Sequence, residues 1–389
     1  MHGLRLIVPG KPVLSVVAVV LASYLVLRVV LTLPLSRLAR AGLAVLVFCL
    51  ALHHRIVASF AGSMASPEIP KAAIAVLGTG FIALLLTTLF VLVLDGITVG
   101  AWALRRRRAL AVLRRPMLRP GLAGVALLLS AWSTWQAMAV PQVRQVEIPI
   151  AGLPAAFDGY RVLQLTDIHA SRLLTGDWVA RLVEDGNAQA PDLIVLTGDM
   201  VDGSTQARAD DVRPLAALRA PDGVIAITGN HEYYGEYLDW MTAFRAMGMQ
   251  VLENEHVVIR RADAALTVAG VTDPVAARYG LPLPDIEAAL AGADPDAPVL
   301  LLEHRPGEAP DRARRGVALQ LSGHTHGGHI IGMDQLVKRA NGGFVSGRYD
   351  VDGMPLYVSN GAGLWPGFAS RIGVPSEITL ITLRATPAR

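Results

Sequence analysis

The 389-residue sequence contains a single cysteine, Cys49, so no disulfide can form within the chain. Cysteine usage therefore does not indicate a cellular compartment, and a structural zinc site built from several thiolates is excluded. Charged residues are also scarce, at 17% against about a quarter in soluble domains, whereas hydrophobic residues reach 52%. Because this imbalance must be concentrated somewhere, it predicts a membrane region beside a globular one.

The long charge-free stretches lie in the first 140 residues. Residues 72–94 and 121–140 contain 23 and 20 consecutive residues without a charge, and each run can cross about 30 Å of hydrocarbon as a helix. We expect two further spans at residues 13–33, where Arg28 can extend to the headgroups, and at residues 41–60, where polar residues interrupt the run. Repeated runs of this length are rare in soluble helical domains. The sequence thus predicts a transmembrane region of about four helices over residues 1–140.

The arginines between the expected spans predict the orientation of the chain. Residues 105–120, between the last two spans, contain seven arginines, and cationic loops remain on the cytoplasmic side. The last span is then expected to run outward and to place the second half of the chain outside the cell inner membrane. Arg37 and Arg40 favour the same orientation, whereas Arg5 and Lys11 favour the opposite one.

Two other functions that the composition suggests are less favoured. The sequence pI of about 9.2 is accounted for by the arginines of the membrane region, and no basic segment interleaved with aromatic residues follows, so we expect no nucleic-acid partner. A transporter would be expected to have acidic or paired polar residues within its spans. Asp95, near the end of the third expected span, is the exception, so an anchor of several helices is the preferred interpretation.

The second half of the chain repeats a short apolar run followed by a polar cluster. A linker and first strand are expected at residues 141–159 and a globular domain at residues 160–389. Helices are expected at residues 176–189 and 237–248, where the apolar spacing is helical. Nearly continuous apolar strands are buried on both faces, and open α/β folds place their sites at the carboxyl ends of strands. The runs are RVLQL, DLIVL, GVIAI, PVLLL and ALQL, which precede TDIHAS, TGDMVDG, TGNHEYY, EHRPGE and SGHTHGGH.

The polar clusters carry side chains that bind divalent metals. In TDIHAS and GHTH, the candidate ligands are two residues apart, and an extended backbone would direct both members of each pair to the same side. Each motif alone is more often a turn, a helix cap or a surface histidine. Their occurrence together at five strand ends favours a metal site. The candidates are Asp167, His169, Asp199, Asn230, His304, His324 and His326.

In this order, TDIH, GD, GNHE, His304 and GHTH resemble the motif set of the calcineurin-like metallophosphoesterase superfamily across residues 160–330. The closing stretch LYVSNGAGLWPGFASRIGVPSEITLITL is similar to the membrane-anchored bacterial branch. The resemblance implies an α/β fold, a four-layer α/β/β/α sandwich around two mixed sheets, behind the all-α transmembrane region. Two positions depart from the branch: His329 stands where Gln often follows, and Asn360 stands where many relatives carry Arg. These departures concern substrate contacts and not the metal ligands.

The resemblance also implies a pair of divalent ions that share Asp199. Ligands made of oxygen and nitrogen without sulfur suit Mn, Fe or Zn. The first ion would be bound by Asp167, His169, Asp199 and His326. The second ion would be bound by Asp199, Asn230, His304 and His324.

Two ions in such a site can lower the pKa of a bridging water from 15.7 towards about 7 and clamp a phosphoryl group for in-line attack. We therefore predict a membrane-anchored phosphodiesterase or phosphatase in which a metal-bridging hydroxide attacks a small or lipid-borne phosphoester. His231 is expected to stabilise or protonate the leaving oxygen, with a solvated neighbour of Asn230 as the alternative. Glu232 is expected to orient a histidine. The alternative function is a non-catalytic membrane receptor or scaffold that retains the fold, which the complete ligand set disfavours.

Overall fold

The computed structural model describes residues 12–387 and divides the chain into two units, Met1–Trp135 and Gln136–Arg389. The division lies near residue 140, where the sequence predicts the end of the transmembrane region. Arg5 and Lys11 lie outside the described residues.

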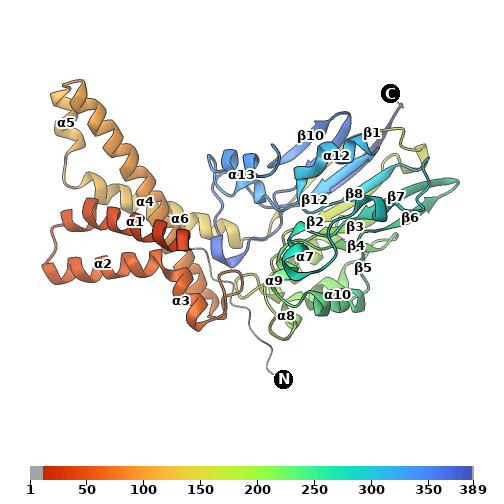
Figure 1. Ribbon diagram of the computed structural model, residues 1–389, viewed down its shortest axis with the longest axis horizontal. Helices are drawn as coiled ribbons and strands as arrows, with labels where there is room; N and C mark the ends of the chain where they lie inside the picture. The colour runs from red at the N-terminus through yellow and green to blue at the C-terminus, as the bar shows by residue number, and fades with distance from the viewer. Residues whose placement is uncertain (1–11, 388–389) are drawn as a thin grey trace. The chain divides into compact units, whose positions relative to one another are not determined.

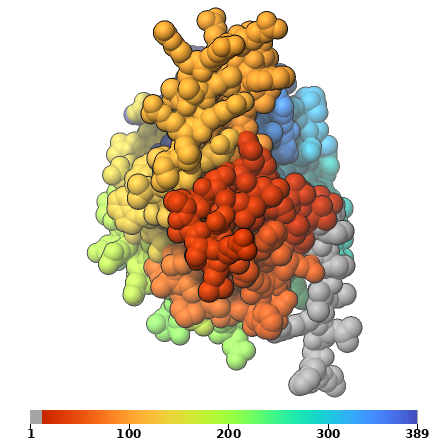
Figure 2. Space-filling model, turned by 90° about the vertical axis from the view of Figure 1, so that its left-hand side faces the viewer, coloured from red at the N-terminus to blue at the C-terminus, as the bar shows by residue number. Residues whose placement is uncertain are grey.

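The first unit consists of helices (Figure 1). Large apolar side chains are exposed on them, including Phe60, Leu38 and Trp102, which are 86%, 84% and 65% exposed. Apolar surface on this scale suits helices that are surrounded by hydrocarbon. In Figure 2, which faces this unit, the segment near residues 100–115 projects at the top in orange. The elements are α1 (Pro12–Arg28), η1 (Val30–Thr32), α2 (Arg37–Ala51), α3 (His53–Phe60), α4 (Lys71–Ala103), α5 (Arg107–Leu113) and α6 (Leu118–Met138).

Two segments of the described chain, Val13–Thr32 and Lys71–Ala103, are long and apolar enough to cross a membrane. The pair α2 and α3 adds a third crossing if it is counted as one span, but the two helices are bent by 66° where they meet. That break falls at Leu52, directly before the two histidines that interrupt the apolar run. The fourth expected span lies in α6, which does not belong to these segments. The number of about four spans stays a prediction.

An ion cluster around Asp95 joins α1, α4 and α6. Arg28 donates two hydrogen bonds to the Asp95 carboxylate at 2.8 and 2.7 Å, Arg119 donates one at 2.6 Å, and the Tyr24 hydroxyl donates one at 2.8 Å. Arg28 is therefore paired within the unit, whereas the sequence suggested only that it could extend to headgroups. Because the end of α1 and the second half of α4 meet here, both helices run towards the same side. The chain between them must then return to the other side, as a crossing by α2 and α3 would achieve.

The second unit contains two mixed six-stranded sheets (Figure 1). The first has the strand order β1-β12-β2-β3-β4-β5, and the second has the order β10-β11-β9-β8-β7-β6. The mixed α/β fold with two sheets that the sequence predicts is confirmed. The strands are β1 (Gln142–Ala151), β2 (Arg161–Leu165), β3 (Leu193–Thr197), β4 (Val224–Ile227), β5 (Gln250–Val251), β6 (Glu255–Arg261), β7 (Ala264–Gly270), β8 (Val299–Leu302), β9 (Leu319–Ser322), β10 (Gly347–Val351), β11 (Met354–Val358) and β12 (Glu377–Thr386).

The side chains of each strand alternate between two buried clusters, which creates four layers. Along β2, Val162 lies in the cluster between the two sheets, whereas Leu163 and Leu165 lie in the cluster that contains residues of α7 and α10. A third cluster joins the second sheet to α11 and α12. The order helix, sheet, sheet, helix follows from this alternation. The helices are α7 (Gly176–Asn187), α8 (Thr205–Val212), α9 (His231–Tyr234), α10 (Tyr237–Ala246), α11 (Ile286–Leu290), α12 (Ala309–Arg314) and α13 (Asp334–Ala340).

The carboxyl ends of the parallel strands meet at one edge of the sandwich. Strands β2, β3 and β4 are parallel in the first sheet, and β8, β9 and β11 are parallel in the second. Hydrogen bonds connect the sheets at these ends. Gln164 Nε2 donates to the carbonyl oxygen of Ser322 at 3.0 Å, and His304 Nδ1 faces the carbonyl oxygen of Thr197 at 2.8 Å. The polar segments that follow the strands are thereby brought together.

Candidate metal centre

The loops at this edge hold several residues in a left-handed backbone conformation. Side chains with a Cβ adopt this conformation rarely, and each instance costs on the order of 1–3 kcal/mol. The expectation of an extended backbone for the Asp167/His169 and His324/His326 pairs is wrong, because all four residues have positive φ. The positive φ angles are 53° at Asp167, 50° at His169, 54° at Asp199, 68° at His324, 49° at His326 and 62° at His329.

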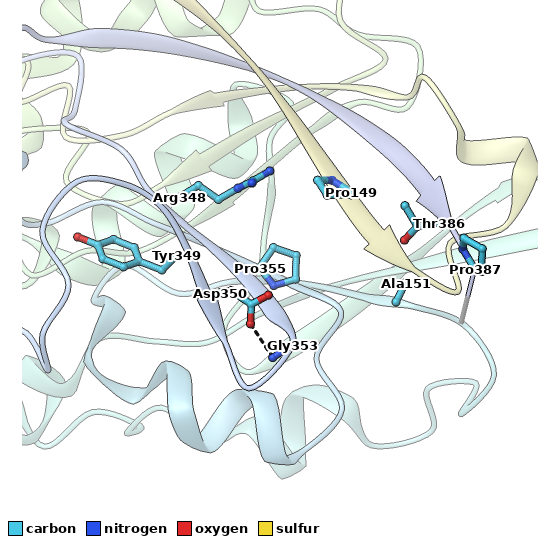
Figure 3. A pocket seen from close by; sticks show the side chains of 9 residues that line it. All are labelled: Pro149, Ala151, Arg348, Tyr349, Asp350, Gly353, Pro355, Thr386 and Pro387. Carbon is cyan, nitrogen blue, oxygen red and sulfur yellow. Dashed lines mark hydrogen bonds between the residues drawn. The ribbon is translucent and has the colours of Figure 1, made fainter. Parts of the chain in front are cut away.

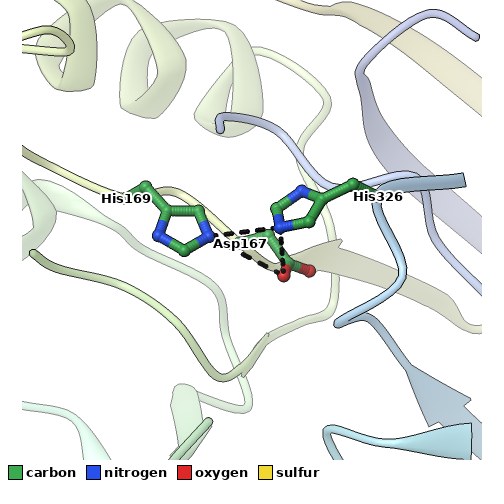
Figure 4. Close-up of side chains that lie close together, drawn as sticks. All are labelled: Asp167, His169 and His326. Carbon is green, nitrogen blue, oxygen red and sulfur yellow. Dashed lines mark hydrogen bonds and ion pairs between the residues drawn. The ribbon is translucent and has the colours of Figure 1, made fainter. Parts of the chain in front are cut away.

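Asp167, His169 and His326 form a buried group (Figure 4). Nε2 of His326 lies 3.4 Å from Oδ1 of Asp167 and 3.3 Å from Nε2 of His169. Nε2 of His169 lies 4.0 Å from the same carboxylate oxygen. One ligand atom from each residue lies within 4.8 Å of the other two, so a single ion could contact all three.

Asp199, His304 and His324 form a second group within the same limit of 4.8 Å. Oδ2 of Asp199 lies 3.2 Å from Nε2 of His304 and 3.8 Å from Nε2 of His169. Asp199 therefore faces ligand candidates of both groups. The backbone N–H of His324 faces both oxygens of Asp167, at 3.0 and 3.2 Å, which ties the second group to the first.

Asp202, which sequence reasoning missed, contacts two histidines at once. Nδ1 of His169 lies 3.1 Å from its Oδ2, and Nδ1 of His231 lies 2.5 Å from its Oδ1. His231 also forms a third group with His169 and Asp199, and its backbone N–H donates to Oδ1 of Asp199 at 2.8 Å. The sequence does contain a signal for Asp202, because it is the second aspartate of TGDMVDG and follows Asp199 by three residues.

Glu232 does not orient a histidine, so that expectation is wrong. Its buried carboxylate accepts the backbone N–H groups of Asp199, Met200 and Gly229 at 3.1, 2.6 and 2.8 Å. It thus fixes the loops that follow β3 and β4. Burial, followed by the nearby charge of Asp199, raises the pKa of Glu232 to about 7.

Hydrogen bonds determine which ring nitrogens carry protons. Nδ1 of His304 faces a carbonyl oxygen and Nδ1 of His169 faces a carboxylate, and both acceptors require an N–H. Each ring then has only Nε2 left for a ligand, and these two atoms lie 3.2 and 3.8 Å from Oδ2 of Asp199. Burial lowers the pKa of His304, but the charge of Asp199 outweighs that effect and raises the pKa to about 10. A divalent ion shared by Asp199 and these nitrogens would take the place of the proton on His304.

Two buried atoms point to the same conclusion. Among the described residues, Oδ1 of Asn230 and Nε2 of His304 have no hydrogen-bond partner. Buried polar atoms are rarely left unpaired, and coordination to a metal would satisfy both. The donor set contains carboxylate, amide and imidazole groups, so the residues present fit divalent metal ions.

The ionisation states also suit metal binding. Burial lowers the pKa of His324 and of His326 well below the ordinary value of 6.5, so both rings are neutral at physiological pH. Neutral imidazole is the form that binds metals. Burial alone would raise the pKa of Asp199, but the charges of His304 and His231 hold it well below its usual range. Asp199 is therefore ionised.

Gly323, which opens the GHTH motif, leaves room for the Asp167 carboxylate. A Cβ on Gly323 would lie 2.2 Å from Oγ1 of Thr166 and 2.3 Å from Oδ2 of Asp167. Thr166 donates to that same oxygen at 2.8 Å. A side chain at this position would therefore displace the carboxylate or the loop.

Arg371 is a second residue that sequence reasoning missed. Its buried guanidinium donates to the backbone carbonyls of His326, Asn360, Gly361 and Gly363 at 3.3, 2.7, 3.2 and 3.1 Å. Burial lowers its pKa to about 10, so it keeps its charge while it braces the GHTHGGH loop. Nothing in the sequence marks it, because its acceptors are carbonyl groups that only the fold assembles.

The structure brings most of the predicted metal ligands together. Six of the seven predicted ligands belong to the three groups, together with His231. Asn230 directly precedes His231, whose backbone N–H donates to Asp199. A separate cavity of about 340 Å³ lies beside the ends of β1 and β12 and the β10–β11 hairpin (Figure 3). None of the predicted ligands lines this cavity. The candidate functional site is therefore the cluster of metal-ligand candidates and not the cavity.

A family model described as calcineurin-like phosphoesterase matches residues 160–328. A transmembrane protein with metallophosphoesterase domain from Bos taurus is 34% identical over 70% of this chain and 64% of its own length. An uncharacterized metallophosphoesterase from Aquifex aeolicus is 30% identical over 67% of this chain and 98% of its own length.

The chain spans less than two thirds of several relatives. The matches cover 64%, 61% and 65% of the Bos taurus, Danio rerio and Helicobacter pylori proteins. Among solved structures, a dimetal phosphatase from Danio rerio gives a TM-score of 0.36 and 12% identity over 53% of this chain and 88% of its own. That likeness is too low to carry an inference.

Replacing Asp202 with Asn should weaken metal binding, because an amide cannot accept from both Nδ1–H groups through two carboxylate oxygens. We expect the Mn²⁺ affinity of the full-length protein, measured by titration calorimetry, to fall about 10–100-fold. Asp210→Asn is the matched control, since Asp210 is 90% exposed. Equal affinities in the Asp202→Asn and Asp210→Asn variants would contradict the role of Asp202.

Gly323→Ala should also lower metal content, because the new methyl group would collide with the Asp167 carboxylate. The control is Gly307→Ala, whose Cβ would have its nearest neighbour at 3.9 Å. Metal analysis of the two purified variants should show a loss only for Gly323→Ala. Full metal content in both variants would show that the loop tolerates a side chain and that the close approach is not required.

Proposed function

Because the chain belongs to the calcineurin-like metallophosphoesterase family, we propose that it is a membrane-anchored, two-metal phosphoester hydrolase. The observation that carries this proposal is the convergence of buried carboxylates and imidazoles within 4.8 Å in overlapping groups. One ion would be held by Asp167, His169, Asp199 and His326. The other would be held by Asp199, Asn230, His304 and His324, with Asp199 between the two.

The donor set supports Mn, Fe or Zn as the resident metals, because it combines oxygen and nitrogen ligands without thiolate. When bound, such ions supply Lewis acidity to a phosphoryl group and lower the pKa of water. The chain's own contribution is to hold the ligands. Asp202 fixes the ring of His169, and Glu232 fixes the backbone on both sides of Asp199 by accepting the N–H groups of Asp199 and Met200.

His231 is the proposed general acid for the leaving oxygen. The charges of Asp202 and Asp199 outweigh the opposing effect of burial and raise its pKa to about 9. The ring is therefore protonated at neutral pH, with Nδ1 engaged by Asp202 and Nε2–H available to donate. Its side chain is only 10% exposed, which disfavours the alternative of a solvated neighbour of Asn230.

The alternative of a non-catalytic receptor or scaffold is less well supported. A scaffold would need the fold and not a histidine that a buried carboxylate holds beside the metal ligands. The Asp202 carboxylate lies between His169 and His231 and serves both. We therefore favour catalysis, on a small or lipid-borne phosphoester that the anchored enzyme meets at the membrane.

We propose a multi-pass location in the cell inner membrane with the second unit on the extracytoplasmic side. The arginines of residues 105–115 support this orientation, because they are exposed and cationic loops stay in the cytoplasm. The Asp95 cluster supports it as well, since it places the start of α6 beside the end of α1.

Measurements of phosphoester hydrolysis and metal content should distinguish the role of His231 from that of the metal ligands. Full-length protein in detergent is expected to hydrolyse bis(4-nitrophenyl) phosphate, to lose activity with a chelator and to regain it with Mn²⁺. Asp199→Asn should lose both metal and activity. His231→Ala should keep its metal but lose about 10²–10⁴-fold in kcat on a substrate with an alkyl leaving group, and less with 4-nitrophenol, which leaves without a proton.

Asp239→Asn, on an exposed position of α10, is the control for Asp199→Asn. Wild-type protein that binds no transition metal, or an Asp199→Asn variant that hydrolyses as fast as the control, would overturn the enzymatic proposal. Loss of metal from His231→Ala would instead make His231 a ligand.

Reporter fusions test the orientation. Alkaline phosphatase fused after residue 389 should be active, because it folds only outside the cytoplasm, whereas the same reporter fused after residue 115 should be inactive. Green fluorescent protein at the same two positions should give the opposite pattern. Fluorescence after residue 389, with inactive phosphatase there, would place the second unit in the cytoplasm.

A further inference from the structure

The segment of residues 330–340, which follows the GHTHGGH loop and contains α13, exposes apolar and basic side chains together. Ile331 and Leu336 are 69% and 65% exposed. Lys338 is half-buried and Arg339 is exposed, and neither forms an ion pair within the part of the chain that the structure describes. Asp334, the one acid of this segment, accepts hydrogen bonds from neighbours inside it.

This 330–340 segment is fixed to the metal centre. The ring of His329 lies 4.9 Å from that of His326, and its carbonyl oxygen accepts the N–H of Ile372 at 3.0 Å. The N–H of Ile331 donates to the carbonyl oxygen of Ile372 at 3.0 Å. The exposed Ile331 is therefore only two residues away from His329, whose ring lies beside the ligand candidate His326.

Gly373 leaves room for the side chain of Ile331. A Cβ on Gly373 would lie 2.2 Å from Cδ1 of Ile331, so the isoleucine packs over bare backbone on one side. Most of its surface still faces outward. Ile331 is thus exposed although its backbone is held in place by hydrogen bonds.

Aromatic rings continue the apolar surface to the catalytic histidine. Trp365 lies 6.2 Å from His231 and Phe368 lies 5.1 Å from His329, measured between ring centroids. Both aromatic side chains are partly exposed. We call Trp365 and Phe368 the aromatic rim. A phosphoester bound at His231 would meet apolar groups on this side.

Exposed aliphatic side chains beside lysine and arginine are the composition that enters the headgroup region of a bilayer. Basic residues near an anionic lipid surface strengthen the attachment of a protein to that surface. Only residues 139–141 lie between the end of α6 and the start of β1, a length of roughly 10 Å. A second unit attached to a membrane-crossing α6 therefore stays within reach of lipid.

We propose that the 330–340 segment docks on a bilayer surface with anionic phospholipid, and that the aromatic rim receives the apolar part of a lipid-borne phosphoester. This inference rests on the phosphoester hydrolysis proposed above. It narrows the substrate class from phosphoesters in general to those carried on a hydrocarbon chain.

Two diesters with the same leaving group test the inference, methyl 4-nitrophenyl phosphate and hexadecyl 4-nitrophenyl phosphate. Full-length protein in nanodiscs of phosphatidylcholine and phosphatidylglycerol should have a larger kcat/KM for the hexadecyl diester. In the Ile331→Gln/Leu336→Gln double variant, the ratio of the two kcat/KM values should fall about tenfold, because burial of the two side chains in lipid is lost. Leu283→Gln, at a position 53% exposed in another loop, should leave the ratio unchanged.

The outcomes separate the inference from the proposed function. Hydrolysis of both diesters with the same ratio in wild type and double variant would overturn membrane docking and leave the hydrolase intact. If wild type hydrolyses neither these diesters nor the monoester 4-nitrophenyl phosphate, both the inference and the proposed function are overturned. Hydrolysis of the monoester alone would overturn only the inference.

A direct measurement guards against a misfolded variant. A fluorophore on Leu336→Cys, in a Cys49→Ser background, should be quenched by nitroxide-labelled phospholipid in the nanodiscs. The same fluorophore on Leu283→Cys should not be quenched. Equal quenching at the two positions, or none at residue 336, would overturn docking.

Discussion

The rest of the site depends on one constraint, the negative charge of Asp199 among several imidazole rings. Its carboxylate stands at the end of β3 in the first sheet, yet it faces imidazoles that follow strands of both sheets. Two of these rings donate their Nδ1–H elsewhere and direct Nε2 towards it. The negative charge of Asp199 favours positive charge between these groups, and a divalent ion can take the place of a proton on His304 there. The sandwich of two sheets supplies the geometry, and divalent ions would supply the charge.

Holding this arrangement is costly, and the surrounding structure is built to sustain it. The left-handed residues of the loops would each relax if their backbone were free. Glu232 and Arg371 prevent this, since one accepts three backbone N–H groups and the other donates to several carbonyls. Both are buried polar groups with several hydrogen bonds, which is the condition under which a protein interior tolerates them. Rigid loops of this kind keep the ligands in place before any metal or substrate arrives.

Sequence patterns predicted the parts of the molecule that follow from local rules. The apolar runs before TDIHAS, TGDMVDG and SGHTHGGH became β2, β3 and β9, because period and composition alone specify a buried strand. The ligand candidates followed, since each stands directly after such a strand. Asp202 and Arg371 were missed, because their roles depend on partners that only tertiary structure brings near. The backbone of Asp167 and His169 was predicted incorrectly for the same reason: a loop under tertiary constraint does not keep the extended geometry of the strand before it. The bend between α2 and α3 and the pairing of Arg28 with Asp95 likewise depend on packing between helices.

X-ray absorption spectroscopy of the metal-loaded full-length protein addresses the pairing of ions around Asp199 most directly. At the metal edge, the account predicts two ions per chain, a first shell of nitrogen and oxygen without sulfur, and a metal-to-metal distance of about 3.5–4 Å. A single ion per chain, or two ions without a metal-to-metal signal in that range, would contradict it.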